Sequence, residues 1–182
     1  MTTDAHYSLR RIFKSAVTSR KTIQELIALM IVAELIDPGE EFWIVSPWIS
    51  DVPLLDNRAG TFDVMNPEWG RREVRLVNLA TQLMAGGSRF IVVTRPGDHN
   101  KVFLRCLREA AVDAAVEASL TTIVRDHLHT KGILTKRGLM LGSMNLTYSG
   151  LELNDEIVEY DVDPASLANA RLAFVGYYEA DS

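Results

Sequence analysis

The sequence has too few cysteines for a disulfide and too few positive charges for a protein that coats nucleic acid. Cys106 is the single cysteine among 182 residues, which excludes an internal disulfide and a four-cysteine zinc site. Glycine and proline together number 17 (11 plus 6), too few for a disordered or collagen-like chain. The formal net charge is -5, from 19 Lys and Arg against 24 Asp and Glu. A local basic groove stays possible, because a net charge describes the whole surface and not a site.

Long hydrophobic runs are also missing. The most apolar stretch is residues 26–36, and Glu34 interrupts it, whereas a bilayer span needs about 20 apolar residues. Residues 1–20 contain basic residues but no apolar core followed by a small-residue cleavage site, so they are not a secretory signal. We therefore expect a cytoplasmic protein with a reduced thiol and no membrane partner.

The order of apolar patterns predicts a single α/β domain over residues 1–182. Helical spacing runs through residues 8–36, with a break near 18–20, and predicts an N-terminal helical segment at 1–38. Short β-branched and aromatic runs then alternate with helical patterns. This is typical of a mixed, largely parallel sheet sandwiched between helices, here in a core at 40–180. The stretch 48–70 has no period and is expected to be a long loop. Strands are predicted at 41–46, 89–94, 120–125, 129–135, 139–142 and 156–160, and helices at 71–85, 100–116 and 164–178.

The functional groups concentrate between His129 and Glu156. His129 and Lys131 are two residues apart, so on a strand they share a face. The predicted hairpin returns the chain beside them with the Ser143 hydroxyl and the Asn145 amide, and the next strand brings the Glu156 carboxylate. Imidazole supplies a nucleophile or general acid, lysine and asparagine stabilise charge on phosphoryl oxygens, and a carboxylate can orient the histidine. This set suits attack on a phosphate diester and requires no metal or other cofactor.

The same residues resemble the motifs of the phospholipase D superfamily, and residues 44–49 (IVSPWI) are similar to its first core strand and exit. The resemblance covers about residues 40–180. It implies an α/β/α fold and a two-step reaction through a covalent phosphohistidine, in which a second histidine protonates the leaving oxygen and then activates water. The segments that carry the resemblance are His129-x-Lys131, Gly142-Ser143-x-Asn145-x-Thr147 and Asn154-x-Glu156.

The resemblance also assigns roles. It implies that His129 is the nucleophile or acid, that Lys131 and Asn145 bind the phosphate, and that Ser143 and Glu156 support them. One position departs from the superfamily pattern H-x-K-x4-D, because Lys136 stands where the pattern has aspartate. The departure bears on hairpin stability and on the charge of the site, and it leaves open a catalytically degenerate member.

A single His-x-Lys motif leaves one side of the phosphorus without a histidine. In-line displacement needs a group on each side, and small single-motif members of the superfamily resemble half-molecules that pair about a two-fold axis. We therefore expect a homodimer that places two copies of His129 across one phosphate.

Candidate substrate-binding residues lie outside the motif. Lys136 and Arg137 are expected at the hairpin tip, where they could touch a polymer backbone. A second basic cluster consists of Arg71, Arg72 and Arg75. Trp69 is a candidate stacking platform for a base, whereas core packing is the default expectation for Trp48. A further basic cluster is expected on the first helix, at Arg10, Arg11, Lys14, Arg20 and Lys21.

Other histidines have plainer interpretations. His127 and His129 could share a face and suggest a metal site, but the sequence offers no evident third ligand. His99 is expected in the entry loop of a helix with Asp98 as the N-cap, and His6 in the terminus.

A nuclease or other phosphodiesterase is the leading prediction, with nucleic acid as partner and DNA ahead of RNA. The small single-motif chain, the clustered positive charge and the missing membrane segment favour it. The chain also resembles stand-alone phospholipase D-like proteins found with bacterial DNA-modification, restriction and phage-defence systems, which implies helper proteins. The main alternative is a degenerate module that binds nucleic acid or needs a partner for turnover. A phospholipid hydrolase is the third, although no membrane-directed stretch supports it.

Overall fold

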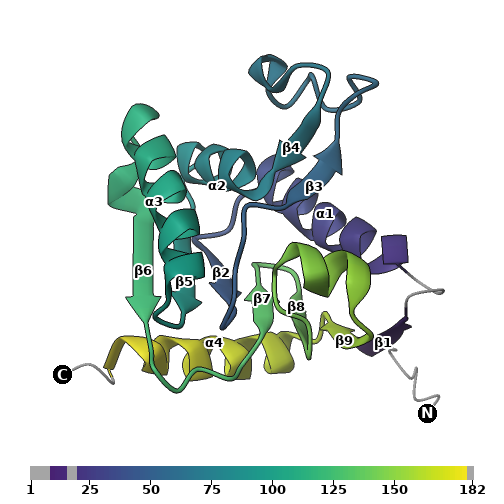
Figure 1. The fold of residues 1–182 in the computed structure, drawn as a ribbon, viewed down its shortest axis with the longest axis vertical. Coiled ribbons are helices and arrows are strands. Elements are labelled where there is room, and N and C mark those ends of the chain that lie inside the picture. The colour runs from purple at the N-terminus through teal and green to yellow at the C-terminus, as the bar shows by residue number, and fades with distance from the viewer. Residues whose placement is uncertain (1–8, 16–19, 180–182) are drawn as a thin grey trace, which may run out of the picture.

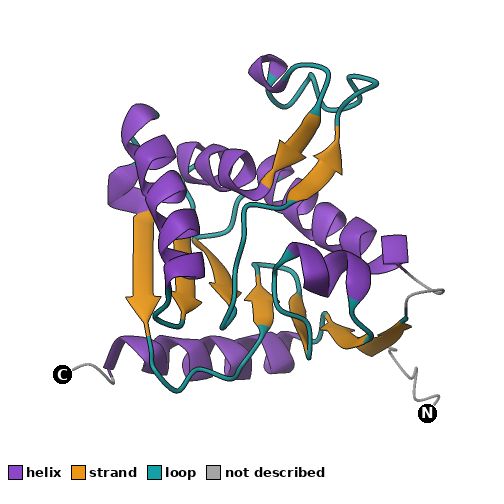
Figure 2. Cartoon of the chain, viewed as in Figure 1, coloured by secondary structure: helices purple, strands orange, loops and turns teal. Residues whose placement is uncertain are grey.

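The computed structural model describes residues 9–15 and 20–179, and a seven-stranded mixed sheet forms its centre (Figure 1). A short two-stranded arm, β3 (Pro53–Asp56) with β4 (Glu73–Arg75), stands away from this sheet (Figure 2). The main sheet follows the order β1 (Leu9–Lys14), β9 (Glu156–Asp161), β8 (Leu139–Gly142), β7 (Gly132–Leu134), β2 (Glu41–Val45), β5 (Arg89–Thr94) and β6 (Leu120–Val124).

The predicted mixed sheet between helices is confirmed, but parallel pairing extends over two of its six neighbouring pairs rather than over most of them. Only β2, β5 and β6 run parallel, and they are joined through helices. The remaining four pairs are antiparallel. The short connection between β7 and β8 accounts for one of these four pairs, because a few residues can join antiparallel strands but cannot make a parallel crossover.

Two helical layers cover the sheet. The first layer consists of α1 (Arg20–Ile36), α2 (Leu76–Ala85) and α3 (Asp98–Asp113), and the second of α4 (Pro164–Glu179). Strand β2 serves both layers: Phe42 and Ile44 pack with α1–α3, while Trp43 and Val45 pack with α4. Burial on both faces explains why this strand is a continuous apolar run. Among the helices of the described residues, none is long and apolar enough to cross a membrane.

The N-terminal segment differs from the predicted helix. Residues 9–14 form the edge strand β1, which pairs with β9, and the helix begins at Arg20. The predicted basic cluster on the first helix is therefore divided between a strand and a helix. Arg11 forms an ion pair with Glu159, and Lys14 is buried, where its ammonium donates to the carbonyl oxygens of Gly150 (2.8 Å) and Asn154 (2.7 Å). Long-range pairing overrides the local helical pattern here. His6 lies outside the described residues.

The arm accounts for two further differences. Residues 53–56, predicted as part of a long loop, form β3 because they pair with β4. The helix predicted to start at residue 71 starts at Leu76, since residues 73–75 belong to β4. Both strands are short, and the first has a register shift, so no clear period marks them in the sequence.

A buried carboxylate holds the tip of the β7–β8 hairpin. Glu34, 1% exposed near the end of α1, accepts the backbone N–H groups of Gly39 (2.9 Å) and Lys136 (3.1 Å), and the Arg137 guanidinium lies 3.5 Å from it. The Lys136 ammonium pairs with Asp37 at 3.0 Å. The superfamily pattern has an aspartate at the position of Lys136. In this chain the carboxylate beside that position comes instead from Glu34 of α1.

We expect Glu34→Ala to lower the free energy of unfolding by about 3 kcal/mol, because two backbone donors and a guanidinium lose their shared acceptor. Urea denaturation at neutral pH measures this change. The control is Glu40→Ala, a nearby exposed glutamate, which should change stability by less than about 0.5 kcal/mol. Equal midpoints for the two variants would contradict the role of Glu34.

Candidate active site

The predicted catalytic residues gather at one edge of the main sheet. The carboxyl ends of β2, β5 and β6 lie at the lower edge in Figure 1, and the start of β7 and the end of β8 meet them there. Lys131 directly precedes β7, and Ser143 directly follows β8, which pairs with β7. Ligand sites commonly form where the carboxyl ends of parallel strands meet.

His129 lies in the segment between β6 and β7 rather than on a strand. Its exposed side chain lines an open hollow of about 430 Å³ together with Arg125, His127 and Tyr177. Arg125 donates to the Tyr177 carbonyl oxygen at 3.3 Å and stacks over its ring. Within the described residues, no three His, Cys, Asp or Glu side chains group closely enough to hold a metal ion, so the pair His127 and His129 has no third ligand there.

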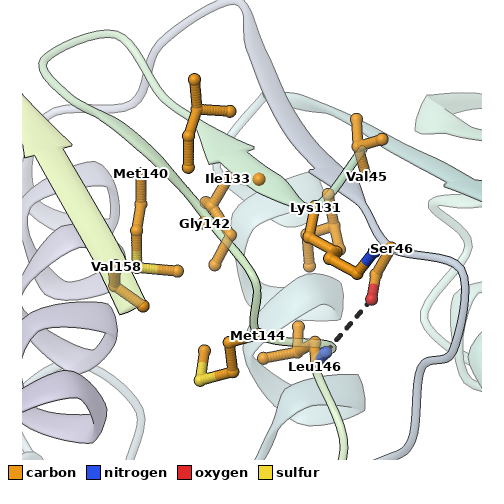
Figure 3. Close-up of a pocket in the computed structure, with 12 residues that line it drawn as sticks. Val45, Ser46, Lys131, Ile133, Met140, Gly142, Met144, Leu146 and Val158 are labelled. Atoms are coloured by element: carbon orange, nitrogen blue, oxygen red, sulfur yellow. Dashed lines mark hydrogen bonds between the residues drawn. The ribbon is translucent and has the colours of Figure 1, made fainter. Parts of the chain in front are cut away.

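Lys131 is fixed beside His129 by a hydrogen bond from its ammonium to the His129 carbonyl oxygen, at 2.6 Å. Figure 3 shows its side chain extended along a niche toward Ser46. The niche itself is mostly apolar and about 10 Å³, the room of roughly one water molecule. Any substrate must therefore lie outside the niche, on the solvent side of the Lys131 ammonium.

Ser143 and Glu156 form one unit that closes the β8–β9 turn. The Ser143 hydroxyl donates to the buried Glu156 carboxylate and accepts the N–H of Ile157 at 3.0 Å. The other Glu156 oxygen accepts from the Asn154 amide at 3.4 Å. Gly142 permits the close approach, because a Cβ there would collide with the Ile157 carbonyl oxygen. Both Glu156 oxygens thus have partners on its own turn, and neither bonds to His129.

The Ser46 hydroxyl joins the exit of β2 to the loop after β8. It donates to the Trp48 carbonyl oxygen at 2.7 Å and accepts the Leu146 N–H at 3.1 Å (Figure 3). Next to it, the Asn145 amide oxygen accepts the Trp48 N–H at 3.4 Å. The Leu146 carbonyl oxygen in turn accepts the Ser50 N–H at 2.9 Å. Asn145 is therefore positioned by the β2 exit as well as by β8.

Asn100, buried at the start of α3, adds a third loop to this edge. Its side-chain oxygen accepts the Ile49 N–H at 3.0 Å, and its amide donates to the carbonyl oxygens of Pro47 and Arg95, both at 2.8 Å. The adjacent His99 lies 2.9 Å from the Ser50 hydroxyl. Sequence reasoning missed Asn100, because it lies inside α3, six residues after the end of β5, and belongs to no recognised motif.

The helix entry differs from the predicted cap. Asp98 is the first residue of α3, Gly97 stands at the N-cap, and no side chain caps the helix. A hydrogen bond from Lys101, at 2.9 Å, holds the pKa of the Asp98 carboxyl below its usual range. This carboxylate is therefore ionised at neutral pH and paired with Lys101.

Three cations lie at this edge, and the exposed carboxylate of Asp126 lines the same hollow as one of them, Arg125. Arg95 follows β5, Arg125 follows β6 and Lys131 precedes β7. Among the residues that the structure describes, none of the three makes an ion pair with a carboxylate. Sequence reasoning missed Arg95 and Arg125 because neither belongs to a cluster of basic residues.

The predicted substrate-binding residues are not brought to this edge. Lys136 and Arg137 lie at the far end of β7 from His129 and are paired with Glu34 and Asp37, as described above. Arg71 pairs with Asp63, and Arg72 donates to the Trp69 carbonyl oxygen at 2.8 Å. Both belong to the connection at the tip of the β3–β4 arm, which stands at the top of Figure 1. Trp69 is 4% exposed, so no ring face is free for stacking.

Comparison with known proteins identifies the fold. No family model matches the sequence, and no curated protein matches it. Among solved structures, NucT from Helicobacter pylori superposes with a TM-score of 0.62 at 10% identity, over 94% of this chain and 96% of that one. Nuc from Salmonella typhimurium, a phospholipase D family member, has a TM-score of 0.56 at 12% identity, over 94% and 92%. TrmBL2, an archaeal chromatin protein with a novel mode of DNA binding, has a TM-score of 0.57 at 13% identity, over 95% of this chain and 52% of that one. The chain therefore has the α/β fold of phospholipase D family proteins.

Proposed function

We propose that this chain is a metal-independent phosphodiesterase that cleaves nucleic acid, DNA ahead of RNA, with His129 as the nucleophile. What supports the proposal is that the segments carrying His129, Lys131 and Asn145 meet at one edge of the sheet, near cations that form no ion pair. Phosphodiesters are anionic, so the charges of Arg95 and Arg125 favour their approach.

The reaction follows from these groups. A ring nitrogen of His129 attacks phosphorus and forms a P–N bond while the P–O bond to the leaving group breaks. A second imidazole gives the leaving oxygen a proton, then takes one from a water molecule that attacks phosphorus and breaks the P–N bond. Lys131 and Asn145 bind the non-bridging oxygens as charge builds on them. The Ser143–Glu156 pair keeps the loop that carries Asn145 in place.

The second imidazole comes from a second copy of the chain. His129 is exposed on the open hollow between β6 and β7, so it can face its own copy across a two-fold axis. Such a homodimer would hold one phosphate between two equivalent histidines.

A nucleic-acid-binding module without turnover is the second candidate. Lys136 at the aspartate position favours it, as does the similarity in fold to TrmBL2, a protein described as binding DNA. In this case the edge would hold phosphates, and cleavage would require a helper protein such as those of bacterial DNA-modification or phage-defence systems.

We expect the wild type to cleave labelled DNA in EDTA and His129→Ala to lose at least about 1,000-fold in rate, because the nucleophile is removed. His127→Ala, which removes the neighbouring exposed imidazole, should lose less than about tenfold. Quenched-flow samples treated with alkali should retain a phosphorus label on the wild-type chain and none on His129→Ala. Equal rates for the wild type and His129→Ala would overturn the proposal. Absence of cleavage by both, with binding retained, would favour the binding module.

If the site is shared in a homodimer, we expect one inactive copy to abolish the activity of the whole dimer. A heterodimer of wild type and His129→Ala, purified through two different tags, should have less than about one per cent of wild-type activity, since the single site needs both histidines. Two independent sites would instead give half of the wild-type activity. Sedimentation should give twice the mass of one 20.3-kDa chain. A fully active monomer would exclude the shared site.

A further inference from the structure

The three tryptophans differ sharply in exposure. Trp43 is 0% and Trp69 4% exposed, whereas Trp48 is 41% exposed at the edge that carries the candidate catalytic residues. Tryptophan is enriched at binding surfaces, because its large apolar ring can pack on a ligand while its N–H finds a polar partner. Trp48 therefore stands out as a side chain that is positioned for contact with a ligand.

The backbone of Trp48 is held on both sides. Its N–H donates to the Asn145 amide oxygen at 3.4 Å, and its carbonyl oxygen accepts from the Ser46 hydroxyl at 2.7 Å. The carbonyl of Pro47 and the N–H of Ile49 are both bound by the buried Asn100 side chain. An indole on so constrained a backbone loses little freedom when it binds a ligand.

The ring itself is supported from the loop after β5 and from the first turn of α3. Gly97, with a φ of +150°, lies against its benzene ring, where a Cβ would be 3.3 Å from Cζ3. His99 meets the indole edge-on, with ring centroids 6.3 Å apart and an interplanar angle of 80°, and is itself fixed by Ser50. With these contacts in place, 41% of Trp48 stays exposed to solvent.

We propose that Trp48 stacks on an unpaired base of a nucleic acid strand, and that this chain therefore selects single-stranded or locally opened nucleic acid. The inference rests on the proposed function, since it takes the phosphate next to that base to lie at Asn145 and Lys131. Asn145 connects the proposed phosphate site with the proposed base site. The amide group that would hold the phosphate also accepts the Trp48 N–H through its oxygen. Arg95, which directly follows β5 in the loop that leads to Gly97, adds positive charge.

Stacking on Trp48 would make the chain prefer single-stranded over double-stranded nucleic acid. A base within a duplex has both faces covered by its neighbours, whereas an unpaired base can place one face on an indole. Stacking on an aromatic side chain corresponds to about 5- to 140-fold in affinity per base. The contact involves a ring face that every base has, so it selects strandedness without selecting sequence.

The test compares ligands with the same phosphates and different bases. In a His129→Ala background, which binds without cleaving, fluorescence anisotropy measures the affinity for a short labelled oligothymidylate, an abasic oligomer of equal length and a duplex. We expect the oligothymidylate to bind at least about fivefold more tightly than the abasic oligomer. Trp48→Phe, which keeps a ring, should keep most of this ratio, and Trp48→Leu, which keeps an apolar side chain without a π face, should bring it close to one.

Tryptophan fluorescence gives an independent reading. Oligothymidylate should quench the emission, and the abasic oligomer should not. Trp69→Phe, the control in the arm, should keep the quenching, while Trp48→Phe should remove it. An unchanged ratio in Trp48→Leu, tighter binding of the duplex, or no binding of the single strand would each overturn the stacking role.

A base-free diester separates this inference from the proposed function. The wild type is assayed in EDTA with bis(p-nitrophenyl) phosphate, which has a phosphodiester and no base to stack. Hydrolysis together with equal affinity for abasic and base-bearing strands would overturn stacking and leave the phosphodiesterase intact. Base-dependent binding without hydrolysis of bis(p-nitrophenyl) phosphate or of labelled DNA would support stacking. It would also replace the phosphodiesterase with the binding module.

Discussion

The Ser46 hydroxyl is the contact on which the candidate site depends most. It is buried at the end of β2, and through one donated and one accepted hydrogen bond it fixes Trp48 and the backbone of Leu146. Those two bonds determine where the β2 exit and the loop after β8 meet, and hence where Asn145 lies. Without the hydroxyl, a buried N–H would lose its acceptor, at a cost of about 1–3 kcal/mol. One hydroxyl thus fixes the position of the β2 exit relative to the loop after β8.

The distribution of charge reconciles an acidic chain with an anionic substrate. Away from the site, several basic side chains are paired with carboxylates, as Lys136 is with Asp37 and Arg71 with Asp63. At the edge of the sheet, Arg95 and Lys131 have no such partner among the described residues. The net charge of -5 is therefore compatible with a locally positive site, because the field at a site depends on which charges nearby are uncompensated.

Sequence patterns predicted the elements whose signal is local. The apolar run at residues 41–45 gave β2, and the spacing from His129 to Glu156 anticipated the hairpin and the shared edge. Pairing partners far along the chain left no such signal, so β1 was expected to be helical. Exposure also depends on tertiary packing: the arm buries Trp69, while the supports around Trp48 leave it open. The motif was therefore visible in the sequence, whereas the contacts that arrange it were not.

The pairing of β1 with β9 also constrains how the chain can assemble. Arg11 and Glu159 are paired across 148 positions of sequence, and Glu156 lies on the same strand as Glu159. Contacts of this separation carry a large loop-closure entropy and form slowly. During synthesis the β2–β5–β6 half of the sheet can emerge and pair first, whereas β1 must wait until β9, residues 156–161, has been made. The Ser143–Glu156 unit is completed at that late stage, so a truncated chain carries the fold's first half without its site.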